Sequence, residues 1–309
     1  MIKKPFLRKE NPWQRRRKKL QYSLFKKLSR NAMPVFVRGG DLISIQPMAW
    51  GEYEPEVVEL IKHWADTNHS DFFWDIGANI GLISCQVGHL FKKVHLFEPN
   101  PDCLSLLKIN LKSMLRNQET HVHPYALGNQ KERLTLMVPF DNWGGAFISS
   151  ADNEYSPDVL AHKDGFTRFD PTQYQAHEVQ VESAVDIMSA LFSSMRSMGL
   201  RKGVIKIDVE GFESLVLKAI ASTVPEDFEV MVVFENWNLD ASLPVLTLGS
   251  NLKADFFHLA SDVRPWPFLP RTVNSIYNFI RGGHSVFLAP LTQMLPAGTC
   301  VLMIAPNDI

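Results

Sequence analysis

The sequence predicts a mostly parallel α/β sheet with helices on both faces, in one domain that follows a basic, helical N-terminal leader. From about residue 70 onward, short apolar segments alternate with amphipathic helical ones, the pattern of parallel strands joined by crossover helices. The 309 residues, with 45% hydrophobic and 21% charged side chains, suffice for one large core of ordinary globular composition. We place the leader at residues 1–50 and the domain at 51–309, with its core at 71–240 and a C-terminal cover at 241–309.

The leader is strongly basic. Residues 1–38 contain thirteen Lys or Arg and one acid, Glu10, which gives a charge of +12. Since the net charge of the whole chain is −1, the remaining residues carry −13. Within residues 13–30, apolar side chains such as Trp13 and Leu20 recur at helical spacing among basic ones, as in a cationic amphipathic helix. Three roles are open for this helix: packing on the domain, peripheral contact with an anionic membrane, and contact with nucleic acid.

The first half of the domain follows the strand and helix rhythm closely. Residues 56–64 indicate a helix, since Pro55 suits its first turn. Residues 72–76 are an apolar strand that ends at Gly77. The elements expected next are a helix over 80–91, a strand over 94–97, a helix that begins at Asn100-Pro101 and runs to Leu115, and a strand over 121–126.

The rhythm breaks between about residues 127 and 181. We interpret this region as an insertion or lid over the sheet edge, with strand-like pieces at 134–138 and 179–181. Its Trp143-Gly144-Gly145 turn either lines the ligand pocket or is a hairpin turn packed by its tryptophan. Regular elements then resume as a helix over 186–198, a strand over 204–207, a helix over 212–222, a strand over 228–234 and a last strand over 300–304.

The strongest motif is the string DIGANIG, from Asp75 to Gly81, at the end of the first strand. Glycines at a strand-to-helix turn let a nucleotide-like ligand approach the backbone closely. The spacing differs from the G-x-G-x-x-G of dinucleotide enzymes, and the acid suits a cofactor with a cationic amino-acid end better than a pyrophosphate. The alternative is a tight turn without a ligand. The candidate cofactor contacts here are Asp75, Gly77, Ala78, Asn79 and Gly81.

The next strand ends in a second candidate contact, Glu98, in the string FEPNP. A carboxylate roughly 20 residues after a glycine turn is placed to accept both hydroxyls of a ribose. Pro99 and Asn100 complete the candidate cofactor contacts. The alternative is an acid that merely favours the start of the following helix through the helix dipole.

The third motif is IKIDVEGFE, residues 205–213. Charged residues in and beside an apolar strand are costly unless they have partners or a task. Strand alternation places Lys206 and Asp208 on the same side. We therefore take Asp208, Glu210 and Lys206 as candidate catalytic residues, with Asp208 and Glu210 on the acceptor side; the alternative is a structural ion pair at the strand rim.

Together with YALGN at Tyr125–Asn129, these three motifs resemble the FkbM family of S-adenosylmethionine-dependent methyltransferases, over about residues 73–237. The resemblance implies a class I methyltransferase (Rossmann-like) fold with a seven-stranded sheet in the order 3-2-1-4-5-7-6. It also implies that Asp75, Gly77, Asn79 and Gly81 surround the methionine part of the cofactor and Glu98 its ribose. The family mostly methylates hydroxyls of sugars and natural products, so the implied activity is O-methylation of a saccharide or related small molecule, in polysaccharide or natural-product biosynthesis.

A magnesium site is a further expectation. Asp208 ends one strand, and Glu235 and Asn236 end the next, which is similar to the arrangement in metal-dependent small-molecule O-methyltransferases. Hard oxygen ligands suit Mg²⁺, which would lower the pKa of the acceptor hydroxyl. Those enzymes carry a Lys or His three residues after the Asp, where this chain has Gly211. The substitutes available are Lys206, Glu210 and Glu213, and His258 or His284 from the tail is another candidate base.

Other functions remain open at this level. An RNA methyltransferase would use the leader to bind its substrate, a scaffold would keep the fold without the activity, and a nicotinamide oxidoreductase would need a different glycine spacing. The IDVEG string lacks the N/D-P-P-Y/F run of amino-group methyltransferases, which speaks against a nucleic-acid substrate. Three separated cysteines form neither a disulfide framework nor a zinc site, so we expect a cytoplasmic protein, peripheral to the inner face of the membrane if the leader binds there.

Overall fold

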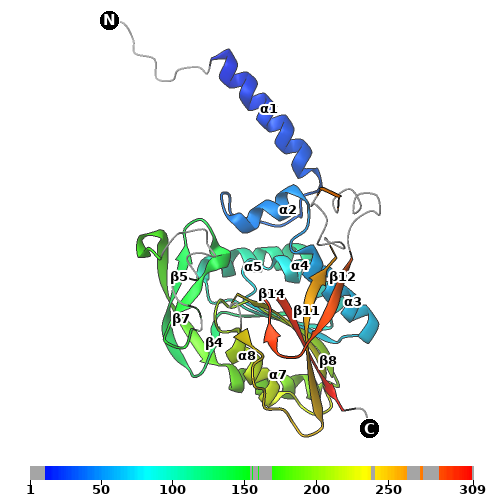
Figure 1. Ribbon diagram of the computed structural model, residues 1–309. Coiled ribbons are helices and arrows are strands. Elements are labelled where there is room, and N and C mark those ends of the chain that lie inside the picture. The colour runs from blue at the N-terminus through cyan, green and yellow to red at the C-terminus, as the bar shows by residue number, and fades with distance from the viewer. Residues whose placement is uncertain are drawn as a thin grey trace, which may run out of the picture.

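The computed structural model describes residues 11–153, 155, 159, 169–237, 241–262, 272–273 and 285–307. Its centre is an eight-stranded mixed sheet in the order β12-β11-β14-β9-β8-β1-β2-β3 (Figure 1). The bounds of these strands are β1 Phe72–Ile76, β2 Lys93–Phe97, β3 Thr120–His123, β8 Lys202–Ile207, β9 Glu229–Asn236, β11 Leu252–Ser261, β12 Val286–Leu291 and β14 Gly298–Pro306.

The strand order confirms the predicted fold class. Strands β3, β2, β1, β8 and β9 are parallel neighbours, and β14 runs antiparallel between β9 and β11. Counted along the chain as seven strands, this is the order 3-2-1-4-5-7-6 that the family resemblance implies. The difference is β12, which pairs antiparallel with β11 and adds an eighth strand at the edge.

Two hydrophobic layers cover the sheet. Alternate residues of β1 point to opposite faces, so Phe72, Trp74 and Ile76 join one cluster and Phe73 joins the other. All five residues of β1 are buried, as expected for a strand covered on both faces. The first cluster includes side chains of α7 Ala184–Ser197 and α8 Glu213–Thr223, and the second includes those of α3 Pro55–Asn68, α4 Leu82–Val87 and α5 Pro101–Met114.

Helix starts follow the expected local chemistry. Asn100 caps α5 by accepting a hydrogen bond from the Asp102 backbone N–H through Oδ1 at 3.0 Å, and Pro101 occupies the first turn. Ser183 caps α7 in the same way, since its Oγ accepts from the Asp186 N–H at 3.3 Å. The predicted helix over 80–91 is shorter than expected: α4 ends at Val87 and continues as a 3₁₀ turn.

The expected insertion is a small sheet of its own, in the order β4-β7-β5-β6. Its core side chains, such as Leu136 and Val181, pack with Phe212 at the start of α8. The insertion is therefore attached to the carboxyl end of β8, beside the motif at 205–213. Its strands are β4 Ala126–Gly128, β5 Glu132–Pro139, β6 Phe147–Ser149 and β7 Tyr174–Ser183.

The C-terminal segment, which we expected to form a cover over the core, differs most from its predicted structure. Strands β11, β12 and β14 lie within the main sheet, because β14 carries apolar side chains on both faces and inserts between β9 and β11. Cys300, Val301, Leu302 and Ile304 are all completely buried. The last predicted strand is confirmed and extended, whereas β11 and β12 were not expected. The domain boundaries themselves remain a prediction.

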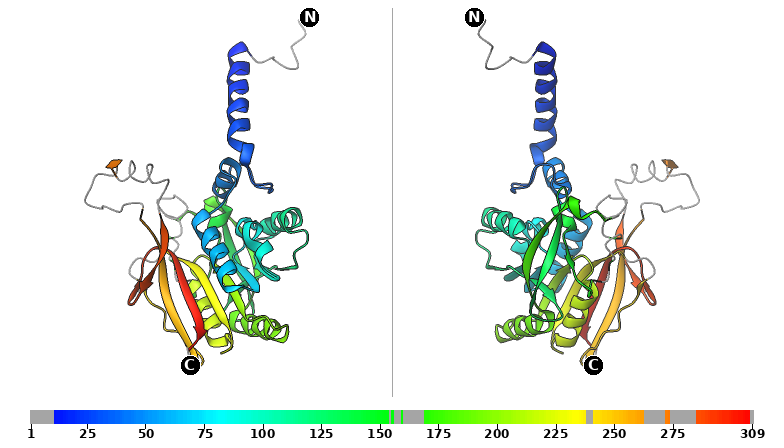
Figure 2. Two further views of the ribbon diagram at one scale, coloured as in Figure 1. Left: turned by 90° about the vertical axis from the view of Figure 1, so that its right-hand side faces the viewer. Right: turned by 90° about the vertical axis from the view of Figure 1, so that its left-hand side faces the viewer.

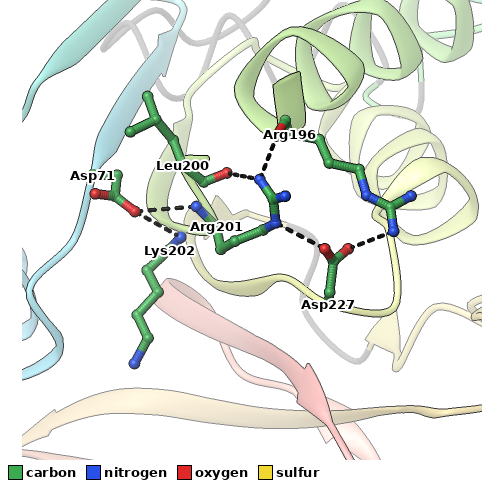
Figure 3. A network of polar contacts seen from close by, with 6 residues as sticks. All are labelled: Asp71, Arg196, Leu200, Arg201, Lys202 and Asp227. Carbon is green, nitrogen blue, oxygen red and sulfur yellow. Dashed lines mark hydrogen bonds and ion pairs between the residues drawn. The ribbon is translucent and has the colours of Figure 1, made fainter. Parts of the chain in front are cut away.

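A polar network fixes the amino ends of the strands (Figure 3). The Asp71 carboxylate, just before β1, accepts from the backbone N–H groups of Arg201 and Lys202 at 3.1 and 3.4 Å. Arg201 donates through Nε to Asp227 at 2.7 Å, and Arg196 pairs with the same carboxylate at 3.3 Å. The network therefore joins the start of β1, the end of α7 and the loop before β9, at the sheet edge opposite the glycine turn.

The leader contains the expected helix, α1 Pro12–Leu28, which begins with a reciprocal Asn11–Gln14 capping box. Figures 1 and 2 show α1 projecting away from the body of the molecule. Trp13 is 78% exposed and Leu20 70%, so the apolar stripe does not pack on the domain and that expectation is wrong. No helix in the described part of the chain has the length and apolarity that crossing a bilayer requires.

Part of the range that we assigned to the leader, Met33 to Phe36, packs on the domain. Met33 is buried in the second cluster. The Asn110 side chain in α5 brackets Phe36, accepting from its N–H at 2.6 Å and donating to its carbonyl at 3.0 Å. The projecting leader is thus confined to the residues before the short turn at Ser29–Asn31.

Candidate active site

The glycine turn after β1 is held too tightly for a side chain. Gly77 has a φ of +81°, and a Cβ there would lie 1.8 Å from the Asp208 carbonyl oxygen. Gly77 and Ala78 both donate their N–H to the Phe97 carbonyl, at 3.0 and 2.9 Å. The turn is therefore wedged between the carboxyl ends of β8 and β2, the edge where ligands bind in open α/β sheets.

Glu98 follows β2 and lies directly behind this turn, hydrogen-bonded to it. Its Oε2 accepts from the Asn79 N–H at 2.8 Å, and its Oε1 from the Asn100 N–H at 2.7 Å. Glu98 is only 6% exposed. Burial raises its pKa to about 7, and the two backbone hydrogen bonds oppose that rise. This carboxyl group thus links the glycine turn to the start of α5.

Two adjoining cavities open at this edge, and their empty volumes, with the open solvent at their mouths included, are about 640 and 870 Å³. Both are lined by Gly77, Asn79, Gly144 and Asp208. The first cavity is largely apolar but for Asn79, Glu98 and Asp208, with Phe97, Pro99, Tyr125, Leu136, Trp143, Ile148 and Phe212 among its lining residues. The second is acidic, with Glu54, Asp75, Asp208, Glu210 and Glu235 beside one basic residue, Lys206.

Lys206 holds the floor of the second cavity together. Its Nζ lies 3.5 Å from Asp75 Oδ1 and donates to Asp208 Oδ2 at 3.2 Å, so Lys206 and Asp208 do share one side. The other Asp75 oxygen accepts from Ser84 Oγ at 2.5 Å. Burial alone lowers the pKa of Lys206, but Asp208, Asp75 and Glu54 hold it well above the usual value. Lys206 therefore stays charged.

The loop after β8 explains the rest of the IKIDVEGFE string. Glu210 and Gly211 have positive φ angles of +49° and +95°. Asn153 from the insertion lies against both residues. Its Nδ2 donates to the Glu210 carbonyl at 2.9 Å, and its Oδ1 lies so close to Gly211 that a Cβ there would be only 1.9 Å away. Glu213 accepts from the Gly211 N–H at 2.9 Å, which makes it part of the loop.

Residues 75–240 match the methyltransferase FkbM domain, over more than half of the chain. The chain belongs to the FkbM methyltransferase family. A curated relative, the hexuronic acid methyltransferase AglP of Haloferax volcanii, is 25% identical over 171 residues, which is 55% of this chain and 57% of AglP. The match thus spans just over half the length of that relative.

Solved structures resemble the chain more distantly. A variant of MtNAS in complex with S-adenosylmethionine has 10% sequence identity and a TM-score of 0.38, over 94% of this chain and 76% of that one. An rRNA methylase from Streptococcus thermophilus has 8% identity and a TM-score of 0.33, over 77% of this chain and 88% of that one. The strand order and the family match define the fold here.

The predicted magnesium site of this FkbM domain finds no support. Asn236 does not line either cavity; its Nδ2 donates to the Leu295 and Pro296 carbonyls at 3.3 and 3.0 Å. Glu235 lines the second cavity, and its Oε2 accepts from Trp237 Nε1 at 2.9 Å. Within the described residues, no group of three or more His, Cys, Asp or Glu side chains is arranged to hold a metal ion.

Other sequence candidates take different places. Trp143 and Gly144 do line the cavities, where Asp41 Oδ2 accepts from the Trp143 N–H at 3.1 Å. His258 lies in β11 opposite Cys300 and does not line either cavity. His284 lies outside the described residues. All three cysteines are buried, and Cys103 Sγ donates to Asn79 Oδ1 at 3.2 Å.

Sequence reasoning missed Tyr53 and Glu54, which line the second cavity from the turn before α3. It also missed Ile43, whose Cγ2 would lie 2.9 Å from a Cβ on Gly144. The signal available for Glu54 was an acid before the proline that opens a helix. That signal predicts a helix start and does not indicate a cavity.

Proposed function

We propose that this chain is an S-adenosylmethionine-dependent O-methyltransferase that acts on a hydroxyl of a saccharide or a related small molecule. The observation that carries the proposal is the pair of cavities at the glycine turn of an FkbM domain, one largely apolar with a buried carboxyl group and one acidic. S-adenosylmethionine, when bound, supplies an electrophilic methyl group on a positively charged sulfur.

The described residues fit this cofactor. Gly77 and Asn79 line both cavities, so a ligand in either one contacts the glycine turn directly. Apolar side chains of the first cavity suit an adenine ring, and Glu98 retains lone pairs for ribose hydroxyls beyond the two N–H groups it already accepts. The carboxylates of the second cavity suit the cationic end. Asp75 lies at the floor of the second cavity, where it accepts a hydrogen bond from Ser84 and pairs with Lys206.

The acceptor is proposed to occupy the second cavity, where Asp208 and Glu210 provide hydrogen-bond acceptors for its hydroxyls. Lys206 fixes Asp208 and balances part of the acidic charge. The name of the relative AglP, a hexuronic acid methyltransferase, supports a sugar as the substrate class. Methyl transfer to oxygen needs alignment of the two reactants and removal of one proton.

Calorimetric titration with S-adenosylhomocysteine tests the cofactor proposal. The intact protein is expected to bind with micromolar affinity, and Glu98→Ala to lose at least tenfold, about 1.4 kcal/mol, because the ribose would lose a charge-assisted hydrogen bond. Glu59→Ala, an exposed acid on α3 paired with Lys62, is the control and should bind normally. Failure of the intact protein to bind would refute the proposal and favour a scaffold on a relict fold.

We also propose that α1 lies on an anionic membrane surface. Its support is the combination of exposed Trp13, Leu20, Leu24 and Phe25 with seven basic residues between positions 15 and 27, on a helix that projects from the body. Deleting residues 1–30 should abolish co-sedimentation with vesicles that contain phosphatidylserine and leave S-adenosylhomocysteine affinity unchanged. Equal sedimentation of the truncated protein would exclude this role, and selective binding of RNA by the intact protein would favour the nucleic-acid alternative.

A further inference from the structure

Glu54 occupies a strained position at the edge of the second cavity. Its φ and ψ are 45° and 62°, in the left-handed region, directly before Pro55. Within the described residues, Asn79, Glu210 and His69 are the other non-glycine residues with positive φ. Glu54, Asn79 and Glu210 all line the second cavity. Such strain persists where the surrounding structure imposes it, and it concentrates at functional sites.

The backbone of this turn is tied to the cofactor-side helix. The Tyr53 N–H donates to Gln86 Oε1 at 3.2 Å, and Gln86 Nε2 donates back to the Tyr53 carbonyl at 3.0 Å. Gln86 belongs to α4, which begins right after the glycine turn. The Glu54 N–H donates to Gln46 Oε1 at 3.2 Å. Two glutamines therefore fix the strained turn relative to the glycine turn.

The Glu54 carboxyl group faces a mixed set of charges. Lys206 and Asp208 come from β8 and its carboxyl end, Glu235 from β9 and Tyr53 from the same turn; Asp75 and Glu210 line the same cavity. Burial raises the pKa of Glu54 to about 7; Lys206 opposes the rise, and Asp208 and Glu235 add to it. Both protonation states are therefore accessible near neutral pH, which is the condition for efficient general-base catalysis.

We propose that Glu54 is the general base of the methyl transfer, an inference that rests on the proposed function. The acceptor oxygen gives its proton to the Glu54 carboxylate while it forms a bond to the methyl carbon. The carbon–sulfur bond breaks and its electron pair stays on sulfur. The positive charge of the sulfonium and the negative charge of the carboxylate disappear together, so the step is balanced.

Glu54 suits this role better than the acids named from the sequence. Asp208 is paired with the Lys206 ammonium at 3.2 Å, which stabilises its charged form and weakens it as a base. Glu210 is only 3% exposed, and its loop is held by Asn153. A positively charged ligand in the second cavity favours the ionised form of Glu54, so binding of S-adenosylmethionine charges the base.

The test counts the protons released when ligand binds. Calorimetry at pH 7 in two buffers of different ionisation enthalpy gives that number for S-adenosylmethionine and for S-adenosylhomocysteine. Because Glu54 is about half protonated at that pH, S-adenosylmethionine should release up to about half a proton more than S-adenosylhomocysteine. Any linked titration of Glu98 is shared by both ligands and cancels in the difference, since their riboses are identical.

Glu54→Gln should abolish this difference while it still binds S-adenosylhomocysteine. Glu56→Gln, an exposed acid two residues along α3, is the matched control and should retain it. With a sugar that the enzyme accepts as substrate, Glu54→Gln should lower the rate of methyl transfer by about 10²–10⁴-fold. The rate of the intact protein should fall as the pH drops below 7, and that of Glu54→Gln should not. An unchanged proton difference in Glu54→Gln would overturn the role of Glu54, whereas absence of binding by the intact protein would overturn the proposed function itself.

Discussion

The cost of a side chain at the glycine turn can be worked out from the geometry. Gly77→Ala places a residue with a Cβ at a φ of +81°, where an L-residue loses about 1–2 kcal/mol relative to the right-handed region. Its Cβ would also lie 1.8 Å from the Asp208 carbonyl oxygen, which is backbone and cannot rotate away. Displacing that atom should cost about 1–3 kcal/mol more, by analogy with overpacked cores.

Gly199→Ala separates the two costs. Gly199 has a φ of +77°, and a Cβ there would meet nothing within 4 Å, so this variant carries the backbone strain without the contact. We expect urea unfolding to show a loss of about 1–2 kcal/mol for Gly199→Ala and about 2–5 kcal/mol for Gly77→Ala. Gly77→Ala should also lose S-adenosylhomocysteine binding, because the new Cβ displaces Asp208, which lines both cavities. Equal stability of the two variants, with binding intact, would refute this account of the turn.

Four further outcomes are expected. Folding raises the pKa of Glu98 from 4.5 to about 7, so its contribution to stability is complete below pH 4.5 and is lost as the pH rises toward 7. Glu98→Gln leaves one of the two backbone N–H groups without an acceptor but does not titrate, so the difference in free energy of unfolding should move by roughly 2–3 kcal/mol in favour of the variant between about pH 4.5 and 7 in urea unfolding. Burial acts to raise the pKa of Asp71, but its hydrogen bonds, first of all from Lys92, lower it. Asp71→Asn should therefore be destabilised near neutral pH, with the difference persisting down to about pH 3.8 and shrinking as the pH falls below that value, through the lowered pKa of the folded protein; a difference independent of pH in thermal melts would count against this. Asn153→Ala leaves the Glu210 carbonyl without this donor and should lower the free energy of unfolding by about 1–3 kcal/mol, with weaker acceptor binding. Because the described lining of the second cavity holds five acids and one lysine, a neutral methyl hexoside should be methylated at least about tenfold faster than the matching methyl hexuronide, and the reverse preference in a radiolabelled transfer assay would contradict that charge argument.

Much of the fold could be predicted because its central strands are buried on both faces. Residues 72–76 and 204–207 are short runs that are apolar except for Asp75 and Lys206, and they are bounded by glycine or acids; such runs indicate parallel strands. The glycine turn, Glu98 and the shared side of Lys206 and Asp208 followed from local spacing. The edge strand β12 and its neighbour β11 were missed because their exposure does not alternate cleanly along the chain.

Site residues that depend on distant contacts escaped prediction for a different reason. The position of Glu54 depends on Gln86, more than thirty residues away, and that of Glu210 on Asn153, which is 57 positions earlier. No periodicity in the sequence encodes such pairs. The metal expectation was unsupported because two adjacent strand residues, Glu235 and Asn236, were assigned to one site, whereas consecutive strand side chains point to opposite faces.

The position of β14 has a consequence for the order of folding. This strand is formed by residues 298–306, yet it lies between β9 and β11 and pairs with residues 230–236 of β9. The 75–240 segment that matches the family would, by itself, leave one edge of β9 unpaired, and such edges promote association between chains. Long-range pairing of this kind is slow, because the intervening chain must close a large loop first. We therefore expect the methyltransferase sheet to be completed late in folding, after the strands that line its cavities have assembled.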